Sequence, residues 1–124
     1  MARPGSVIGW TLDEHDRAEL LRQHRPRYAT IVAHHVTLAT DAEHRDLPHP
    51  VRAAIIGHAD DGQGVEAMVV TIDGDTARPD GSTFHITWSL AEGRRARDSN
   101  DVLKERDWQL FGPPIAITLT PARI

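Results

Sequence analysis

The chain has 124 residues, a formal net charge of −4 and no cysteine. This length favours a single domain over residues 1–124 with one hydrophobic core, and the absence of thiols excludes disulfides, thiolate metal sites and cysteine nucleophiles. The negative charge argues against a broad basic face for long nucleic acids, although a single phosphate or a short nucleotide is compatible with it.

The first half of the chain predicts one helix followed by one strand. Residues 11–24 begin with Thr11 and Glu14 at the spacing of a capping box. Acidic residues fill the first turn and Pro26 follows the segment, so we expect a helix that ends before this proline. Residues 28–40 (YATIVAHHVTLAT) are rich in β-branched side chains and predict one long central strand. A polar, proline-broken loop follows.

The second half predicts a hairpin, a strand, a short helix and a last strand. Two apolar arms flank DDGQG within residues 51–74, which is the pattern of a hairpin with a glycine turn. Residues 82–90 (STFHITWSL) alternate cleanly and predict a second central strand. Within the polar segment 92–107 we expect a short helix starting near Ser99, and residues 113–124 predict a final strand. Hairpin connections without repeated crossover helices favour an α+β fold built on antiparallel sheet.

The second central strand separates polar from apolar side chains. Because successive side chains of a strand point to opposite faces, His85 and Thr87 share one face. We expect Thr83 and Ser89 on that same face and Trp88 on the opposite face, in the core. One face of this strand therefore presents an imidazole beside a hydroxyl.

The first central strand repeats this arrangement. Alternation places His35 and Thr37 on one face and sends His34 to the opposite face, where we expect it to pack or to form structural hydrogen bonds. A single histidine on a strand is usually structural. Two matching pairs on two strand-like segments point instead to a shared pocket, lined by two imidazoles and two threonine hydroxyls if the strands are neighbours.

Such a pocket suits phosphate chemistry. The pKa of imidazole is ordinarily about 6.5, so near neutral pH one ring can accept a proton while the other donates one. Hydrolysis of a ribose 2′,3′-cyclic phosphate needs this division, because a water is deprotonated as it attacks phosphorus and the departing ribose oxygen is protonated. The hydroxyls can bind the non-bridging oxygens and hold the phosphate between the rings. This chemistry requires no metal and no cofactor.

The paired motifs HVTL at 35–38 and HITW at 85–88 resemble the signature of the 2H phosphoesterase superfamily. More closely, residues 28–103, including the Ser-Asn stretch after the second motif, are similar to the cyclic phosphodiesterase domain of fungal and plant tRNA ligases. This resemblance implies a bilobal pair of antiparallel sheets with helices packed outside and the motifs facing each other across a cleft. It also implies hydrolysis of 2′,3′-cyclic phosphates on RNA ends or on nucleotides.

The same resemblance implies a role for each motif residue. It makes His35 the acid that protonates the leaving oxygen and His85 the base that acts on water. It makes Thr37 and Thr87 the residues that bind the phosphate, and likeness to the tRNA ligases implies a 2′-phosphate product. A role in tRNA splicing does not follow, because the sequence shows no ligase or kinase segment.

Four further residues are candidate substrate contacts. Ser99 and Asn100 could cap the short helix, or could lie near the cleft as the resemblance implies. Arg94 opens the run RRAR at 94–97, which could contact flanking phosphates or could be a solvated loop. Tyr28 could stack on a base, as could Trp10 and Trp108, although packing in the core or at an edge is the simpler expectation for each.

Two alternatives to this enzyme stay open. The same cleft could hold a nucleotide or an RNA end without cleaving it, or could act on another small cyclic diester. A metal site is not expected, because none of the eight histidines stands in a spacing such as H-E-x-x-H. Since the first residues lack the flanks of a signal peptide and no apolar run could span a bilayer, we expect a cytoplasmic protein without membrane contacts. The sequence leaves the oligomeric state open.

Overall fold

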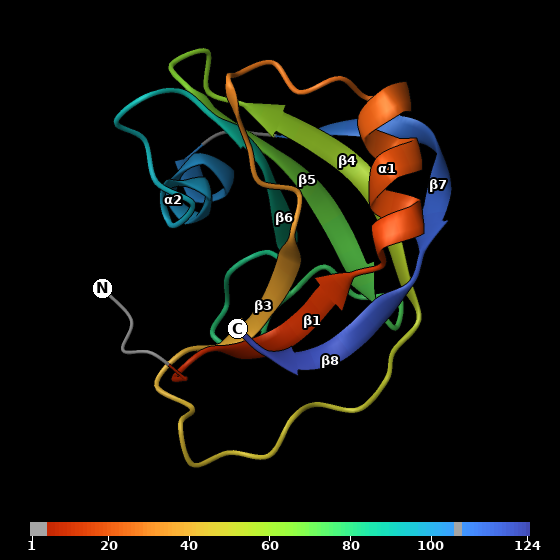
Figure 1. The fold of residues 1–124 in the computed structure, drawn as a ribbon, viewed down its shortest axis with the longest axis vertical. Coiled ribbons are helices and arrows are strands. Elements are labelled where there is room, and N and C mark those ends of the chain that lie inside the picture. Colours follow the sequence, from red (N-terminus) through yellow and green to blue (C-terminus); the bar gives the residue numbers. More distant parts are fainter. Residues whose placement is uncertain (1–4, 106–107) are drawn as a thin grey trace.

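The computed structural model describes residues 5–105 and 108–124 and has an α+β fold, in which one curled antiparallel sheet carries two helices (Figure 1). In chain order the elements are β1 (Ile8–Leu12), α1 (Glu14–Gln23), β2 (Thr30–Ile31), β3 (His35–Ala39), β4 (Ala53–Asp60), β5 (Val65–Ile72), β6 (His85–Leu90), α2 (Asp98–Glu105), β7 (Gln109–Ile117) and β8 (Leu119–Arg123). The end of the polar segment predicted over 92–107 lies outside the described residues. Within the described chain, neither helix is long and apolar enough to cross a membrane.

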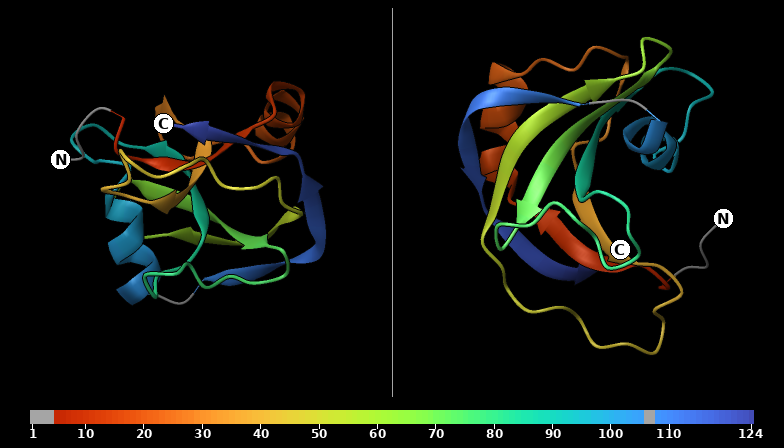
Figure 2. Two further views of the ribbon diagram at one scale, coloured as in Figure 1. Left: turned by 90° about the horizontal axis from the view of Figure 1, so that it is seen from below. Right: turned by 180° about the vertical axis from the view of Figure 1, so that it is seen from behind.

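The strands follow the order β7-β4-β5-β6-β3-β1-β8, with β2 pairing with β6 beside β3. Because only Thr118 separates β7 from β8, the two edges of the sheet come together and the sheet curls (Figures 1 and 2). The expected pair of separate sheets is thus one continuous sheet. Its narrowest junction joins β3 to β6 through a single register pair, Val36 with Ile86, whereas β5 and β6 share five pairs. The two halves of the sheet therefore meet at the two strands that carry the motifs.

The inner face of the curl carries the main core. Trp10, Val36, Met68 and Trp88 are each at most 2% exposed and belong to one cluster drawn from both halves of the sheet. Leu20 of α1 packs into the same cluster, so α1 closes the curl on one side. Burial of each large apolar side chain is worth about 1.5–3 kcal/mol. The predicted core position of Trp88 is confirmed.

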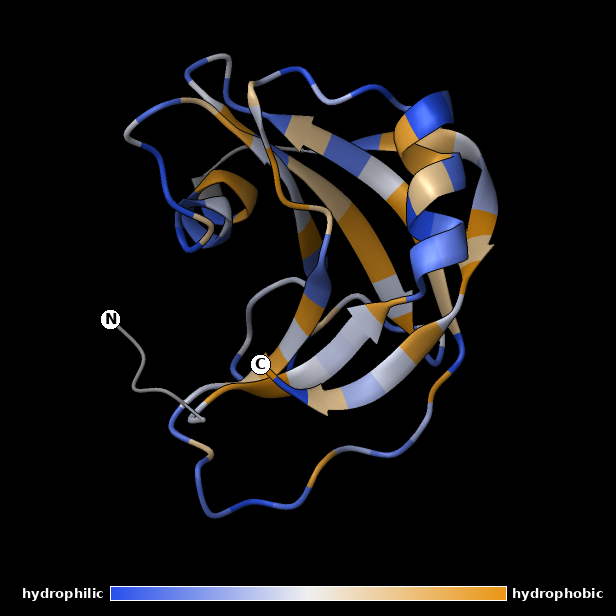
Figure 3. Cartoon of the chain, in the orientation of Figure 1, coloured by the Kyte–Doolittle hydropathy of each residue, from blue (hydrophilic) through white to orange (hydrophobic). Residues whose placement is uncertain are grey.

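The opposite face of the sheet is covered in part by α2. Val102 and Leu103 of this helix pack against Ala59 of β4 and Val65 and Val69 of β5. Figure 3 shows apolar residues recurring along the strands, whereas the loop that follows β3 is largely polar. Beside α2, β6 pairs with β3 (Figure 1).

The first helix begins later than the capping-box pattern predicts. Thr11 lies in β1, which was not predicted and which pairs with both β3 and β8. Asp13 caps the helix instead, since its carboxylate accepts the backbone N–H of Asp16 at 3.0 Å. The capping chemistry is the expected one, but the strand pairing of β1 decides where it acts.

The long strand predicted over residues 28–40 is two short strands, β2 and β3. Between them lies Ala33, which is fully buried and has a φ of 44°. Arg17 of α1 donates to the carbonyl of Ala33 at 2.9 Å, and the Ala33 N–H donates to the carbonyl of Thr87 at 2.9 Å. This left-handed residue interrupts the strand directly before the first motif.

The remaining predicted elements are close to those observed. The hairpin predicted over residues 51–74 is confirmed as β4 and β5, and the short helix starts at Asp98, one residue before the expected Ser99. The last strand predicted over residues 113–124 is in fact two strands, because the chain turns at Thr118 and pairs first with β4 and then with β1.

Candidate active site

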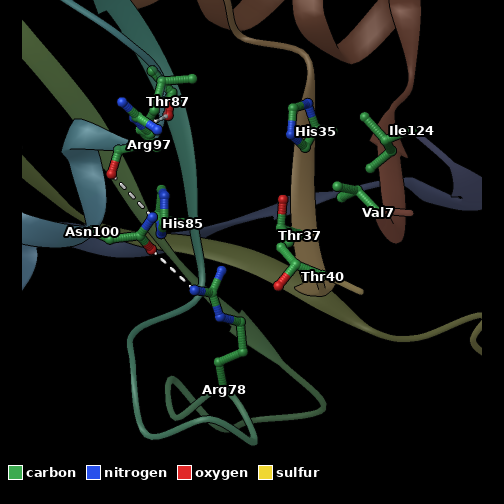
Figure 4. A pocket seen from close by; sticks show the side chains of 11 residues that line it. Val7, His35, Thr37, Thr40, Arg78, His85, Thr87, Arg97, Asn100 and Ile124 are labelled. Atoms are coloured by element: carbon green, nitrogen blue, oxygen red, sulfur yellow. Dashed lines mark hydrogen bonds between the residues drawn. The ribbon is translucent and has the colours of Figure 1, made fainter. Parts of the chain in front are cut away.

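A pocket of about 320 Å³ lies where β3 meets β6, on the face opposite the main core (Figure 4). Its lining includes all four residues of the two motifs, together with Arg78 and Asn100: His35, Thr37, His85, Thr87, Arg78 and Asn100. Figure 4 shows His35 and Thr37 on one wall and His85 and Thr87 on the facing wall. The two motifs, fifty residues apart in the sequence, thus line one cavity.

The register of the strands explains this convergence. Val36 pairs with Ile86, and both side chains point into the core. Because side chains alternate, the motif residues on either side of this pair point to the opposite face, into the pocket. The backbone of β1 supports β3 at short range, since a Cβ atom at Gly9 would lie 2.0 Å from the carbonyl oxygen of Val36.

The imidazole of His85 is held in one tautomer. Its Nδ1 lies 2.8 Å from the carbonyl oxygen of Thr83. A carbonyl only accepts hydrogen bonds, so Nδ1 carries the proton and Nε2 keeps its lone pair. Burial lowers the pKa of His85, the hydrogen bond to Thr83 opposes this shift, and the positive charge of Arg78 adds to the lowering. The ring is therefore prepared to accept a proton at Nε2.

His35 is half-buried on the facing wall. Burial, together with the neighbouring His34 and His85, lowers the pKa of His35 to about 4. The packing expected for His34 is wrong, because this residue is exposed; it forms a hydrogen bond instead, since its Nδ1 lies 3.1 Å from Nδ1 of His35. The left-handed Ala33 breaks the alternation on which that expectation depended.

The two threonine hydroxyls of the motifs have different surroundings. The Oγ1 atom of Thr87 lies 3.2 Å from the carbonyl oxygen of Ala96 and 2.9 Å from Oγ of Ser99. Ser99 is fully buried behind Thr87 and contacts this threonine rather than the pocket. By contrast, the described residues offer no hydrogen-bond partner to the hydroxyl of Thr37.

Arg78 is the main pocket residue that the sequence did not reveal. It lies in the loop between β5 and β6, lines the pocket and is only 9% exposed. Its Nη2 donates to Oδ1 of Asn100 at 3.0 Å, and its Nε donates to Asp80 at 3.2 Å. The signal in the sequence was an arginine among turn residues, TARPDGS, and such a pattern does not distinguish a buried guanidinium from a solvated one.

The predicted substrate contacts are only partly in place. Asn100 lines the pocket as expected, and within the run RRAR the residues that line it are Ala96 and Arg97. Arg94 instead pairs with Asp61 at 3.0 Å and with Asp98, while the hydroxyl of Tyr28 donates to Asp60 at 2.6 Å. Neither Arg94 nor Tyr28 lines the pocket, because each is held by carboxylates near the turn of the β4–β5 hairpin.

The polar face predicted for the second central strand ends before Ser89. The register of β5 with β6 shifts between Glu66 and Ala67, where β6 contains one more residue than β5. Ser89 consequently lies opposite Glu66 and donates to its carboxylate at 2.7 Å. His58 also contacts this buried carboxylate, at 2.8 Å, so Ser89 belongs to a structural cluster outside the pocket.

The other candidates considered from the sequence lie elsewhere. Trp10 is in the core and Trp108 packs beside α2, so neither faces the pocket. Among the described residues, one group of three metal-ligand types is close together, namely Asp13, His15 and Asp16 at the start of α1. The carboxylate of Asp13 caps α1 by accepting the backbone N–H of Asp16, and the carboxylate of Asp16 accepts the backbone N–H of Thr118 between β7 and β8. Both carboxylates therefore have structural partners, and neither lines the pocket.

The pocket combines two imidazoles, a buried guanidinium and a hydroxyl that has no hydrogen-bond partner among the described residues, and none of the described residues that line it is acidic. Such a set of groups is chemically suited to bind an anion and to transfer protons to and from it. No protein-family model, curated protein or solved structure matches the chain. The case for a function therefore depends on the geometry of this pocket.

Proposed function

We propose that the protein is a metal-independent 2′,3′-cyclic phosphodiesterase of the 2H phosphoesterase type, acting on cyclic phosphates of nucleotides or RNA ends. The observation that supports this most strongly is that His35 and His85, from two neighbouring strands, line one pocket with Thr37 and Arg78. In this proposal each half of the curled sheet corresponds to one lobe and contributes one motif strand.

The proposed reaction assigns each imidazole one proton transfer. Nε2 of His85 takes a proton from a water as the water oxygen bonds to phosphorus. The bond between phosphorus and one ribose oxygen breaks, and protonated His35 gives its proton to that oxygen. When the 3′ oxygen leaves, the product is a 2′-phosphate. Exchange with solvent then returns both rings to their starting states, so the reaction is a net addition of water.

Protonation of His35 depends on the bound anion. In the free protein burial keeps the pKa values of both rings low, so both are neutral near pH 7. A phosphate placed beside His35 favours the imidazolium and raises its pKa, because an opposite charge nearby stabilises the charged form. Substrate binding in this way supplies the protonated acid that the leaving oxygen needs.

The direct test is hydrolysis of the four nucleoside 2′,3′-cyclic phosphates in the presence of EDTA, followed by phosphorus NMR. The spectrum reports turnover and the position of the retained phosphate together. We expect His35→Ala and His85→Ala each to lower kcat by about 10²–10⁴, which is the usual contribution of general acid–base groups. His44→Ala is a matched control, since His44 is exposed and outside the pocket. Equal turnover in the wild type and both pocket variants would exclude the mechanism.

A binding module without catalysis is the second candidate. One observation favours this candidate. The hydroxyl of Thr87 forms hydrogen bonds with Ala96 and Ser99 inside the protein, so it does not help to hold a phosphate between the two rings. Calorimetry that shows saturable binding of a cyclic nucleotide, with no product after prolonged incubation, would support this candidate over the enzyme.

A further inference from the structure

We infer that Arg78, and not Thr87, binds the phosphate oxygens on the β6 side of the pocket. Anion recognition is then asymmetric, with the Thr37 hydroxyl acting from β3 and the guanidinium acting from the loop that precedes β6. The inference rests on the proposed function for its substrate, but the binding of phosphate itself can be measured without catalysis.

The hydroxyl of Thr87 has no hydrogen available for a ligand. A threonine hydroxyl has one proton, and the carbonyl of Ala96, 3.2 Å away, can only accept it. The hydroxyl of Ser99, 2.9 Å away, then donates to Thr87. Rotation of Thr87 toward a phosphate would remove the hydrogen bond to Ala96 and disturb a buried pair, which typically costs about 1–3 kcal/mol. The two hydroxyls of the motifs are therefore not equivalent.

Part of the Arg78 guanidinium is available to donate hydrogen bonds to a ligand. Asp80 and Asn100 bind Nε and Nη2, and within residues 5–105 and 108–124 no group accepts a hydrogen bond from Nη1. Among the described residues Asp80 is the one counter-ion of this buried cation, and its side chain is 59% exposed to solvent. A guanidinium presents paired donors that match the oxygens of a phosphate. An anion in the pocket would accept the hydrogen bonds that Nη1 of Arg78 can donate.

The loop of Arg78 is ordered around this residue. The backbone N–H of Arg78 donates to the carbonyl of Ser82 at 2.8 Å, and the Gly81 N–H donates to the carbonyl of Arg78 at 2.8 Å. Ala77 and Thr83 form a bridge that closes the loop directly before β6. Figure 4 shows the guanidinium at the base of the pocket, between Asn100 and Thr40. Donors held in place before the ligand arrives bind it with little reorganisation.

Inorganic phosphate is the first probe, with affinity measured by calorimetry on the full chain. Arg78→Gln should weaken phosphate binding by about tenfold to a hundredfold, the usual worth of a charge-assisted hydrogen bond. The matched control is Arg95→Gln, because Arg95 is exposed and does not line the pocket, and its loss should change affinity by less than about fivefold. Unchanged affinity in Arg78→Gln overturns the inference.

A pair of isosteric variants tests the asymmetry without touching Arg78. Thr37→Val should weaken phosphate binding, whereas Thr87→Val should leave the affinity close to that of the wild type. Guanidinium chloride at low millimolar concentration should restore part of the turnover of Arg78→Ala, with sodium chloride as the control for ionic strength. An equal loss in the two threonine variants contradicts the inference even if the Arg78 variants do not fold.

These measurements separate the inference from the proposed enzyme. Phosphate binding that depends on Arg78, in a protein that hydrolyses no cyclic phosphate, would support the anion site and reject the phosphodiesterase. Hydrolysis that depends on His35 and His85 but is unaffected by Arg78→Gln would support the enzyme and reject the role of Arg78.

Discussion

The pKa values of both pocket imidazoles, His35 and His85, are lowered. Burial is the largest cause for both, and the neighbouring histidines lower His35 further, to about 4. His85 keeps part of its basicity through the hydrogen bond from its Nδ1–H to Thr83. At the residue scale, the environment therefore makes His35 the stronger acid once it is protonated, which suits His35 to the proposed role of acid and His85 to that of base.

This difference predicts an acidic optimum for kcat/KM. The proposed reaction needs His35 protonated and His85 neutral. In the free protein this is a minor protonation state, because the acid is the ring with the strongly lowered pKa, and its population is greatest between the two pKa values. One of these values is about 4, and the other lies below the ordinary 6.5, so the bell-shaped profile should peak below pH 6.5. Initial rates at low substrate concentration across pH 3.5–8.5 measure it. A maximum at pH 7–8 would contradict the lowered pKa values of the two rings.

At the scale of elements, the first motif depends on the close approach of β1 to β3. The position next to Val36 and Thr37 is Gly9, where a Cβ atom would meet backbone atoms at 2.0 Å and 3.1 Å. Backbone cannot move aside as a flexible side chain can. The glycine therefore allows β1 to hold the strand that carries His35 in register with β6.

Gly9→Ala should accordingly destabilise the fold and displace β3. We expect a loss of roughly 2–3 kcal/mol in the free energy of unfolding, typical of forced overpacking, measured by urea denaturation. Gly112→Ala is the matched control, since a Cβ atom there meets nothing within 4 Å, and it should change stability by less than about 1 kcal/mol. Equal stability of the two variants would show that β1 and β3 can separate without penalty.

At the scale of the whole molecule, the buried imidazoles link stability to pH. Folding lowers the pKa of His35 from 6.5 to about 4, so the unfolded chain binds a proton in this range that the folded protein does not. The free energy of unfolding is therefore not reduced by His35 above pH 6.5, and it decreases as the pH falls toward 4. A fall of the pKa by this amount corresponds to roughly 3 kcal/mol. His85 acts in the same direction.

Chemical denaturation at pH 7 and at pH 4.5 tests this linkage. Wild-type protein should lose more stability on acidification than His35→Asn, because the variant lacks the group that titrates in this window. The matched control is His44→Asn, which replaces an exposed histidine and should keep the pH dependence of the wild type. An identical loss in wild type and His35→Asn would mean that other groups carry the acid sensitivity.

Local periodicity determined much of the fold and the centre of the site. Alternation in HITWSL predicted the buried Trp88 and the shared face of His85 and Thr87, and the glycine turn predicted the β4–β5 hairpin. These features depend on residues close in sequence, where the period of a strand fixes the direction of each side chain. The sequence predicted that the two motifs line one pocket only on the condition that their strands are neighbours. The pairing of Val36 with Ile86 shows that they are.

Tertiary structure decided the features that depend on distant contacts. The left-handed Ala33 splits the first motif strand, and the register shift beside Glu66 turns Ser89 away from the pocket. Asn100 and Asp80 hold Arg78 inside the pocket, although a turn-rich loop would ordinarily expose it. No local pattern encodes these outcomes, because each depends on which segments meet when the sheet curls. The sequence by itself specified the groups on which the proposed chemistry depends, and the fold decided which of them line one pocket.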